Sequence, residues 1–442
     1  MTARALALVD GEHYPPVVRA AIAAAGPEDQ VVAALLLGGT EKLRGAPDYG
    51  VPLEDAGRDA AAGMVAAARK HAAGRIVDLS DEPVLSERER FRLVSHALAA
   101  GLSYRGADFE FRAPPRPAAG VPAIAVIGTG KRIGKTAVCG HLARLLGERH
   151  RVVLVAMGRG GPEQPELVDG AAEAPSLDDL LARSRAGQHA ASDFLEDAAL
   201  ARVTAVGARR CGSGLAGTPF LSNVQEAVVV ARGHDPELLL LEGSGAALPP
   251  VAADRTLLVT SAARPASELE VGLGPYRVLV SDVVVITMSE SPLAESHQVE
   301  AVRAAVLAAR PDATVIAAVL RPHPAEPVAG ERVALFTTAG AAIHDRLAAF
   351  LRDEHGADVT AVVGSLSDRS ALAADLESPG VLAAGTYLIE IKAAAIDVVA
   401  EAARERGVRV VFCDNRPRSV AGEPDLDAVA LDVAAGVVAV GA

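Results

Sequence analysis

The chain has 442 residues, of which half are hydrophobic but only 3% are aromatic, so roughly two to four domains with aliphatic cores are expected. A formal net charge of −13 argues against a surface for nucleic acid or for an anionic membrane, because both partners require a basic footprint. Three cysteines without metal-ligand spacing, an N-terminus without a signal-peptide layout and the absence of any apolar run of roughly 18 residues predict a cytoplasmic protein without disulfides, zinc or membrane spans.

Two proline-rich stretches, residues 112–122 and 321–331, divide the chain, because proline lacks an amide donor and restricts the residue before it. Neither stretch is expected to continue a helix or a central strand. They predict an N-terminal domain over residues 1–112, a middle domain over 121–321 and a C-terminal part over 332–442. The C-terminal part is either a separate α/β domain or an extension of the middle sheet.

Short aliphatic runs alternate with alanine-rich patterns of helical period along the whole chain. The expected strands are 5–9, 31–37, 75–79, 123–127, 152–157, 238–241, 256–260, 282–288, 314–320, 333–336, 358–363, 387–391 and 408–412. The clearest helices are expected at 15–25, 58–71, 87–101 and 135–148. Continuous aliphatic strands separated by helices are typical of α/β folds, with parallel sheets covered by helices on both faces.

The strongest motif is a glycine-rich loop that follows an aliphatic strand and precedes a helix. Its residues are Gly128, Thr129, Gly130, Lys131, Arg132, Ile133, Gly134, Lys135 and Thr136. Backbone amides of such a loop and the start of the following helix bind phosphate, so the whole loop is predicted to bind a nucleotide. Lys135 is expected to reach the β- and γ-phosphates, and the Thr136 hydroxyl to bind Mg²⁺. The middle domain is therefore predicted to be a P-loop NTPase domain, flanked by a Rossmann-like N-terminal domain and the α/β C-terminal part.

The loop departs from the standard pattern at Thr129, where that pattern has glycine. Its spacing resembles the loop of dethiobiotin synthetase, which also begins with Gly-Thr and ends with Gly-Lys-Thr. In that class a glutamate at the end of a later strand holds the metal, and Glu242 after four leucines fits this position. The resemblance implies ATP as the nucleotide, and Mg²⁺ held by Thr136 and Glu242.

Charged or glycine-rich loops follow several strands, at the ends where open α/β sheets bind ligands. They are residues 10–14, 38–42, 78–83, 157–163 and 209–214. Each by itself is more often an ordinary loop, but three consecutive charged strand ends in the first domain favour a ligand site. Asp193, Glu196 and Asp197 share a helical spacing that is more typical of a solvated face.

Together these strings resemble one family, cyclic 2,3-diphosphoglycerate synthetase, over nearly the whole chain. The most specific strings are residues 8–14, 127–138 and 155–163, and others are 38–43, 77–84, 106–109, 241–247, 392–395 and 413–415. The family uses ATP and Mg²⁺ to join the two phosphates of 2,3-diphosphoglycerate into an intramolecular anhydride, with release of ADP and phosphate. The resemblance implies a ligase for this substrate, active in compatible-solute biosynthesis. A homo-oligomer is expected, with a dimer as the guess, although the sequence does not reveal the oligomeric state.

The implied substrate carries one carboxylate and two phosphates, so several cations should surround it. The candidates are His13, Lys42, Arg88, Arg92 and Arg105 from the first domain, and Arg159, Arg209 and Arg210 from the middle domain. Lys135, with Mg²⁺, is expected to stabilise the transferring phosphoryl group, and Lys131 or Arg132 to act on the same charge as catalytic residues.

Two alternatives fit the same motifs. One is a P-loop kinase or a dethiobiotin-like ligase that acts on another phosphorylated small acid, and the other is a nucleotide-gated switch protein. The lysines add a separate hypothesis, because there are only five: Lys42, Lys70, Lys131, Lys135 and Lys392. A coding bias explains the scarcity, yet all except Lys70 lie in the strings described above, where a compact ammonium is not exchangeable for a guanidinium.

Overall fold

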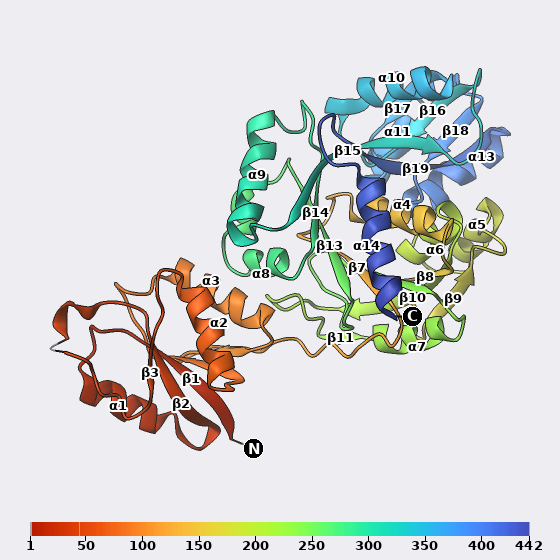
Figure 1. The fold of residues 1–442 in the computed structure, drawn as a ribbon. Coiled ribbons are helices and arrows are strands. Elements are labelled where there is room, and N and C mark those ends of the chain that lie inside the picture. The colour runs from red at the N-terminus through yellow and green to blue at the C-terminus, as the bar shows by residue number, and fades with distance from the viewer. Residues whose placement is uncertain (1, 44, 442) are drawn as a thin grey trace. The chain divides into compact units, whose positions relative to one another are not determined.

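The computed structural model describes residues 2–43 and 45–441, and confirms an α/β fold of mostly parallel sheets flanked by helices (Figure 1). The chain forms two compact units. The first comprises Met1–Pro115, Ser267–Val280 and Ala305–Pro311, and the second comprises Arg116–Ala266, Ser281–Ala304 and Asp312–Ala442.

The first unit contains a six-stranded sheet in the order β3-β2-β1-β4-β5-β6. Its strands are β1 (Ala3–Val9), β2 (Asp29–Leu36), β3 (Leu53–Asp55), β4 (Arg75–Asp78), β5 (Ser103–Arg105) and β6 (Glu110–Phe111), and its helices include α1 (Pro15–Ala24), α2 (Ala60–Lys70), α3 (Glu87–Ala99) and α8 (Gly274–Leu279). All pairs are parallel except β5 with β6. Connections leave β1 and β4 toward opposite sides, which creates a crevice between their carboxyl ends.

The second unit contains a 13-stranded sheet in the order β11-β10-β8-β12-β7-β13-β14-β15-β19-β18-β16-β17, with β9 paired to β10. Its strands are β7 (Ala123–Gly128), β8 (Val152–Gly158), β9 (Glu166–Asp169), β10 (Thr204–Cys211), β11 (Leu221–Ser222), β12 (Leu238–Glu242), β13 (Arg255–Ser261), β14 (Val283–Thr287), β15 (Thr314–Pro324), β16 (Arg332–Phe336), β17 (Asp358–Val363), β18 (Thr386–Ile389) and β19 (Arg409–Ser419). Its helices are α4 (Lys135–Gly147), α5 (Leu177–Arg185), α6 (Asp193–Leu200), α7 (Val224–Arg232), α10 (His344–His355), α11 (Arg369–Asp375), α12 (Pro379–Leu382), α13 (Glu401–Arg406) and α14 (Leu426–Gly441), together with α9 (Ser296–Ala309) up to Ala304.

The C-terminal strands extend the middle sheet, because β15 pairs with β19 in an antiparallel ladder. Strand β15 runs through Pro322 and Pro324, although the sequence predicted that this stretch interrupts strands. Beyond Ala317, β15 is bordered by β19 but no longer by β14, so this half of β15 has one open edge. Proline is tolerated in such an edge position, because a missing amide donor there leaves no ladder bond unmade.

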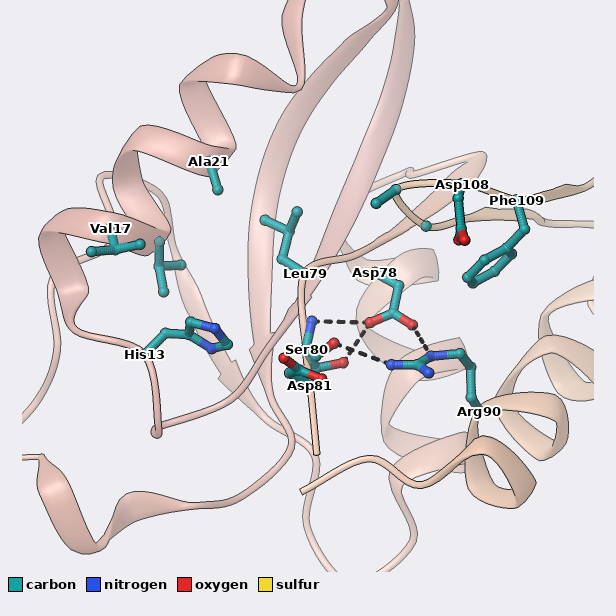
Figure 2. Close-up of a pocket in the computed structure, with 13 residues that line it drawn as sticks. His13, Val17, Ala21, Asp78, Leu79, Ser80, Asp81, Arg90, Asp108 and Phe109 are labelled. Atoms are coloured by element: carbon teal, nitrogen blue, oxygen red, sulfur yellow. Dashed lines mark hydrogen bonds and ion pairs between the residues drawn. The ribbon is translucent and has the colours of Figure 1, made fainter. Parts of the chain in front are cut away.

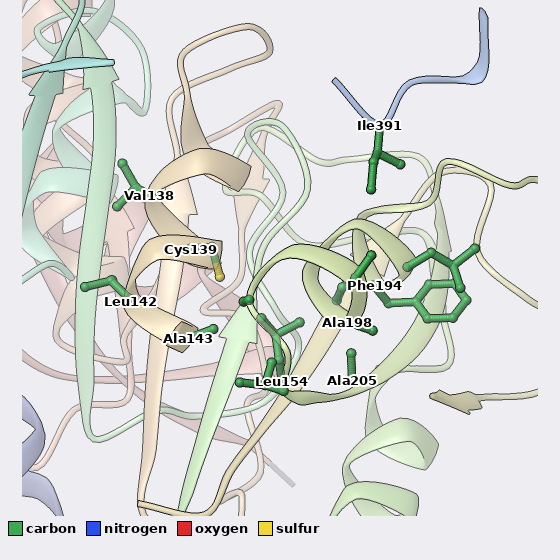
Figure 3. Packing of buried hydrophobic residues seen from close by; sticks show 14 of the residues in the cluster. Val138, Cys139, Leu142, Ala143, Leu154, Phe194, Ala198, Ala205 and Ile391 are labelled. Carbon is green, nitrogen blue, oxygen red and sulfur yellow. The ribbon is translucent and has the colours of Figure 1, made fainter. Parts of the chain in front are cut away.

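The core of the second unit lies between its sheet and helices α4 and α6 (Figure 3). Val138 and Leu142 of α4, Leu154 of β8 and Phe194 of α6 are all buried in it. Gly207 makes room for the aromatic ring, since a Cβ at this position would lie 2.6 Å from two ring carbons of Phe194. The helix that follows the glycine-rich loop is thereby fixed between the sheet and α6.

Replacing Phe194 by alanine is expected to lower the free energy of unfolding by about 3–5 kcal/mol, because it leaves a cavity in this core. Urea unfolding followed by far-UV circular dichroism measures the loss. The matched control is Phe220→Ala, because Phe220 is 94% exposed and its removal should change stability by less than about 0.5 kcal/mol. Similar losses for the two variants would contradict the assignment of Phe194 to the core.

Candidate functional site

The glycine-rich loop lies between β7 and α4, as the sequence predicted. Gly134 precedes α4 with a φ of 77°, a left-handed conformation that favours glycine, and a Cβ there would lie 2.8 Å from Leu320. The Thr129 amide donates to the Val259 carbonyl at 3.1 Å, and the Thr287 hydroxyl contacts the Ile133 carbonyl at 2.7 Å. Strands β13 and β14 therefore hold the loop in its curled form.

Lys135, the first residue of α4, forms a buried ion pair with Glu242 at the end of β12. Burial would lower the pKa of Lys135, but the charges of Glu242 and Asp193 outweigh it and hold the pKa above its ordinary value. Burial also raises the pKa of Glu242, although Lys135 opposes this shift. In the structure the Lys135 ammonium is thus bound to a carboxylate, within the loop that is predicted to bind phosphate.

Thr136 and Glu242 have the chemistry of a magnesium site. Glu242 Oε2 is buried without a hydrogen-bond partner, and Thr136 lies near enough to lower the pKa of Glu242. Hydroxyl and carboxylate oxygens suit Mg²⁺, which keeps several waters and shares phosphate oxygens. In the ranges 2–43 and 45–441 no group of three or more His, Cys, Asp or Glu could hold a metal ion. A cation held by Thr136 and Glu242 would therefore also need phosphate oxygens and water.

Three of the predicted cations converge beside this loop. Measured from the position that a Cβ of Gly245 would take, Arg210 Nη2 lies at 3.6 Å, Arg159 Nη2 at 3.7 Å and Lys131 Cγ at 3.7 Å. Lys131 follows β7, Arg159 follows β8, Arg210 lies near the end of β10, and Gly245 follows β12. These four strands are neighbours in the sheet, so the residues meet along one carboxyl edge. We call Lys131, Arg159 and Arg210 the cation cluster.

The cation cluster has uncompensated positive charge. Burial, followed by the charges of Arg159 and Arg210, lowers the pKa of Lys131, and burial with Arg159 lowers that of Arg210. Among the residues that the structure describes, none of the three forms an ion pair within 4.0 Å. Arg210 is buried and donates to the carbonyls of Gly212 at 3.0 Å and Ser244 at 2.9 Å, while its Nε has no partner. Fixed guanidinium groups of this kind suit a phosphate or a carboxylate.

Arg209 and Arg132 are not among the cations nearest Gly245, although the charge of Arg132 also lowers the pKa of Lys131. Successive side chains of a strand point to opposite faces, so Arg209 is directed away from the face that carries Arg210. Its amide donates to Asn223 Oδ1 at 2.6 Å. Arg132 is exposed, and its φ of 59° lies in the left-handed region within the loop. A role in binding for these two arginines stays a prediction.

Helix α6 differs from the solvated face that its spacing predicted. Asp197 is buried, because Gly140 of α4 has no side chain and lets α6 approach until Asp197 Oδ1 lies 3.1 Å from the position of the missing Cβ. Asp193 is half-buried, and its charge raises the pKa of Lys135. Glu196 accepts a hydrogen bond from Lys392 at 2.6 Å. Tertiary packing, which helical spacing does not report, turns this acidic face inward.

The first unit has its own pocket, of about 430 Å³, at the crevice between the carboxyl ends of β1 and β4 (Figure 2). His13, Ser80 and Asp81 line it from the loops after these strands, Arg90 from α3, and Phe109 from the segment after β5. A mixed polar and apolar lining at such a crevice is typical of a small-molecule site.

Two buried carboxylates organise this pocket. Asp10 accepts bonds from the amides of Glu12 and His13 through Oδ1, and from the Asp81 amide at 2.8 Å through Oδ2. His13 Nδ1 also lies 2.8 Å from Asp10 Oδ1. Asp10 thereby ties the loop after β1 to the loop after β4.

Asp78, in the lining of the pocket, also accepts several hydrogen bonds. It accepts hydrogen bonds from Ser80 and, at 2.8 Å, from Arg90 Nε (Figure 2). The Tyr104 hydroxyl also donates to Asp78, at 2.8 Å. Burial, supported by the Asp78 charge, raises the pKa of Tyr104 well above its usual value. The Arg90 charge is thus largely compensated by Asp78 before any ligand binds.

The five cations predicted in the first unit are not gathered in one place. His13 lines the pocket, Lys42 pairs with Glu12, and the exposed Arg88 contacts Glu270. Arg92 pairs with Asp59 and Glu89, and Arg105 pairs with Glu28 and Asp29. Substrate binding by these residues stays a prediction.

The sequence reasoning did not select Arg90, although helical periodicity contains the signal. Arg90 precedes the buried residues Leu93, Val94 and Ala97 of α3 by three, four and seven positions, so it belongs to their inward face. Arg88 and Arg92, four residues apart, share a different face of the helix.

Three family models match the chain in succession. They are described as the N-terminal domain (residues 4–112), the P-loop domain (residues 123–319) and the C-terminal domain (residues 324–416) of cyclic 2,3-diphosphoglycerate synthetase. A curated protein of that name from Rubrobacter xylanophilus is 51% identical over 424 residues, which cover 94% of each chain. One from Thermococcus gammatolerans is 41% identical and covers 96% of each chain.

Among solved structures, LpxK from Aquifex aeolicus in complex with ATP is similar at 15% identity, with a TM-score of 0.40. The match covers 72% of this chain and 88% of LpxK, and it is too distant to support a statement about activity. Within the described parts of the chain, every helix is too short or too polar to cross a membrane.

Glu196 should make the stability of the protein depend on pH. Burial raises its pKa to about 7 against the lowering influence of Lys392, so the folded state binds a proton that the unfolded state has already released. This contribution to stability is present below the ordinary pKa of 4.5 and is lost as the pH rises toward about 7. Relative to Glu196→Gln, the free energy of unfolding of the wild type should fall by on the order of 3 kcal/mol across this window.

Urea unfolding of both proteins between about pH 5 and pH 8 measures this difference. Asp197 and Glu242, whose pKa values are also raised, remain in both proteins, so the comparison isolates Glu196. A constant difference across the window would contradict the raised pKa.

Proposed function

Because the chain belongs to the cyclic 2,3-diphosphoglycerate synthetase family, we propose that it uses ATP and Mg²⁺ to convert 2,3-diphosphoglycerate into its cyclic anhydride, releasing ADP and phosphate. The observation that carries the proposal is the cation cluster beside the glycine-rich loop. The loop and Lys135 would bind the nucleotide phosphates, and Lys131, Arg159 and Arg210 would bind a phosphate of the substrate. Both groups of residues belong to the second unit.

Nucleotide binding requires an exchange of partners at Lys135. Its ammonium must leave Glu242 for the β- and γ-phosphates, which frees the Glu242 carboxylate. Thr136 and Glu242 would then hold Mg²⁺, which neutralises phosphate charge during transfer. The pattern names no residue for the base, so the preference for ATP comes from the family.

The proposed chemistry has two displacements. An oxygen of one substrate phosphate attacks the γ-phosphorus of ATP, and ADP leaves. An oxygen of the second substrate phosphate then attacks the phosphorus of the first, the anhydride ring closes, and the transferred group leaves as inorganic phosphate. Phosphate oxygens are already anionic nucleophiles, so neither step requires a general base.

Charge neutralisation is the main task of the protein in this scheme. Ring closure brings two phosphates together, and like charges a few ångströms apart repel strongly where water is excluded. The uncompensated guanidinium and ammonium groups of the cation cluster would offset that repulsion, and Lys135 would stabilise the transferring group. An acidic protein can perform this task because the positive charge is local.

The first-unit pocket is a further candidate for contact with the substrate. His13 lies at its lining, and Arg90 reaches it from α3. Because Arg90 is compensated by Asp78, this pocket offers less net positive charge than the cation cluster. We therefore favour the cation cluster over this pocket as the substrate site.

Phosphorus NMR of the full-length protein with ATP and 2,3-diphosphoglycerate tests the proposal. We expect an upfield anhydride resonance together with ADP and inorganic phosphate. A stable phosphorylated product without that resonance would instead identify a kinase. Slow ATP hydrolysis at a rate that 2,3-diphosphoglycerate does not change would identify a switch protein.

Removing either guanidinium group of the cation cluster should weaken turnover. Arg159→Gln and Arg210→Gln are each expected to lower kcat/KM for 2,3-diphosphoglycerate by about 10- to 100-fold, since each removes charge-assisted hydrogen bonds to a phosphate. The KM for ATP should change much less. Initial-rate measurements with each substrate varied in turn separate the two effects.

The matched control is Arg255→Gln, because Arg255 is exposed at the amino end of β13. Its turnover should equal that of the wild type. If Arg159→Gln and Arg210→Gln also behave as the wild type, the cation cluster does not bind the substrate.

A further inference from the structure

Lys392 connects the C-terminal segment of the second unit to helix α6. It lies three residues after the end of β18, and its Nζ donates to Glu196 Oε2 at 2.6 Å. The preceding residue, Ile391, is fully buried in the same apolar core as Phe194 and Cys139 (Figure 3). An ion pair and apolar packing therefore dock this segment on α6 together.

The segment that bears Lys392 is itself held firmly. Glu390 accepts hydrogen bonds from the amide of Thr338 at 2.9 Å and from its hydroxyl at 2.8 Å, and from Asn415 Nδ2 at 2.8 Å. These partners follow β16 and belong to β19, the strands on either side of β18. These hydrogen bonds fix the backbone next to Lys392 at the carboxyl edge of the sheet.

The first turn of α6 connects Lys392 to the nucleotide site, because it carries both Glu196 and Asp193. Glu196 follows Asp193 by three positions, so the two carboxylates lie on the same side of the helix. Helix α6 packs against α4, which begins at Lys135, since Asp197 Oδ1 lies 3.1 Å from the position that a Cβ of Gly140 would take. A displacement of α6 would therefore move Asp193 and disturb the helix that carries Lys135.

Lys392 is one of two lysines that form ion pairs with a group of carboxylates near the glycine-rich loop. Asp193, Glu196, Asp197 and Glu242 gather behind the loop, and Lys135 compensates one of them while Lys392 compensates another. Burial would lower the pKa of Lys392, but Glu196 and Glu390 raise it above its ordinary value, so Lys392 stays charged. When Lys135 leaves Glu242 for a phosphate, Lys392 remains as the lysine that still neutralises this acidic group.

We propose that Lys392 is a positioning residue of the nucleotide site: through Glu196 it fixes the first turn of α6, and with it Asp193, relative to Lys135 and Glu242. The proposal assigns the C-terminal segment a part in nucleotide binding and turnover. It rests on the proposed function only in placing the nucleotide at the same loop.

A simpler role for Lys392 is attachment of the C-terminal segment, and the chain contains a control for that role. Arg185 of α5 donates to both carboxylate oxygens of Glu401 at 2.8 Å, which also joins a helix of the P-loop region to the C-terminal segment. Arg185 is exposed and Glu401 is half-buried, and neither is among the groups that act on Lys135 or Glu242. Loss of attachment alone should therefore affect Arg185→Gln and Lys392→Met alike.

The experiment compares Lys392→Met, Lys392→Arg, Glu196→Gln and Arg185→Gln in the full-length chain. Calorimetry gives the affinity for ADP with Mg²⁺, initial rates give kcat and KM, and thermal unfolding checks the fold. Lys392→Met should weaken ADP binding and lower kcat by about tenfold or more, since small displacements of site groups cost this much. Lys392→Arg should restore most of both values, because a guanidinium can still pair with Glu196, so we no longer expect Lys392 to be among the lysines that arginine cannot replace. Arg185→Gln should equal the wild type in both.

Wild-type ADP affinity and kcat in Lys392→Met would overturn the proposal, and so would equal losses in Arg185→Gln. If Lys392→Met does not fold, Glu196→Gln removes the same ion pair with little change of shape. Reduced ADP affinity in Glu196→Gln then supports the proposal, and unchanged affinity overturns it. Because ADP binding is measured without cyclisation, a wild type that makes no cyclic product refutes the proposed function but not the position of Lys392.

Discussion

The buried ion pair between Lys135 and Glu242 is the interaction on which the second unit depends. It joins the first residue of α4 to the end of β12, and so fixes the glycine-rich loop against the centre of the sheet. Removing two charges from water costs free energy, which a close ion pair with well-fixed partners offsets. Strands β13 and β14 hold the loop by hydrogen bonds, and α6 packs against α4 at Gly140, so both partners are fixed. A phosphate that enters this loop replaces an existing anionic partner, so no buried ammonium waits unpaired.

The two units use carboxylates in different ways. In the first unit, Asp10 and Asp78 accept hydrogen bonds from loop amides, a hydroxyl and Arg90. These bonds give the pocket its shape. In the second unit, Glu242 keeps one buried oxygen without a partner, beside a hydroxyl that can share a cation. The first arrangement leaves no carboxylate oxygen of Asp10 or Asp78 without a partner, whereas the second leaves Glu242 Oε2 without one. This contrast is why the second unit carries the proposed chemistry.

The sequence was informative where structure depends on neighbouring residues in the chain. The strand, loop and helix around Lys135 were predictable, because aliphatic runs, glycines and helical period are local signals. The convergence of Arg159 and Arg210 followed from strand ends that share one edge. The inward turn of Asp197 and the run of β15 through Pro322 were not predictable, since each depends on a distant partner, α4 in one case and β19 in the other. The ion-pair partners of the lysines, such as Glu242 for Lys135 and Glu196 for Lys392, were also not predictable from the sequence.

The ladder between β15 and β19 has a consequence for how this family can vary. Strand β15 begins within the P-loop segment, which ends at residue 319, and its last seven residues, Ala318–Pro324, pair with Cys413–Ser419 around the end of the C-terminal segment. Loss of the last segment would leave this half of β15 without a paired strand on either side, and unpaired strands invite pairing with another chain. We therefore expect the second and third segments to be inherited together. The first unit is likewise not a separate segment of the chain, because it also includes Ser267–Val280 and Ala305–Pro311 from the P-loop segment.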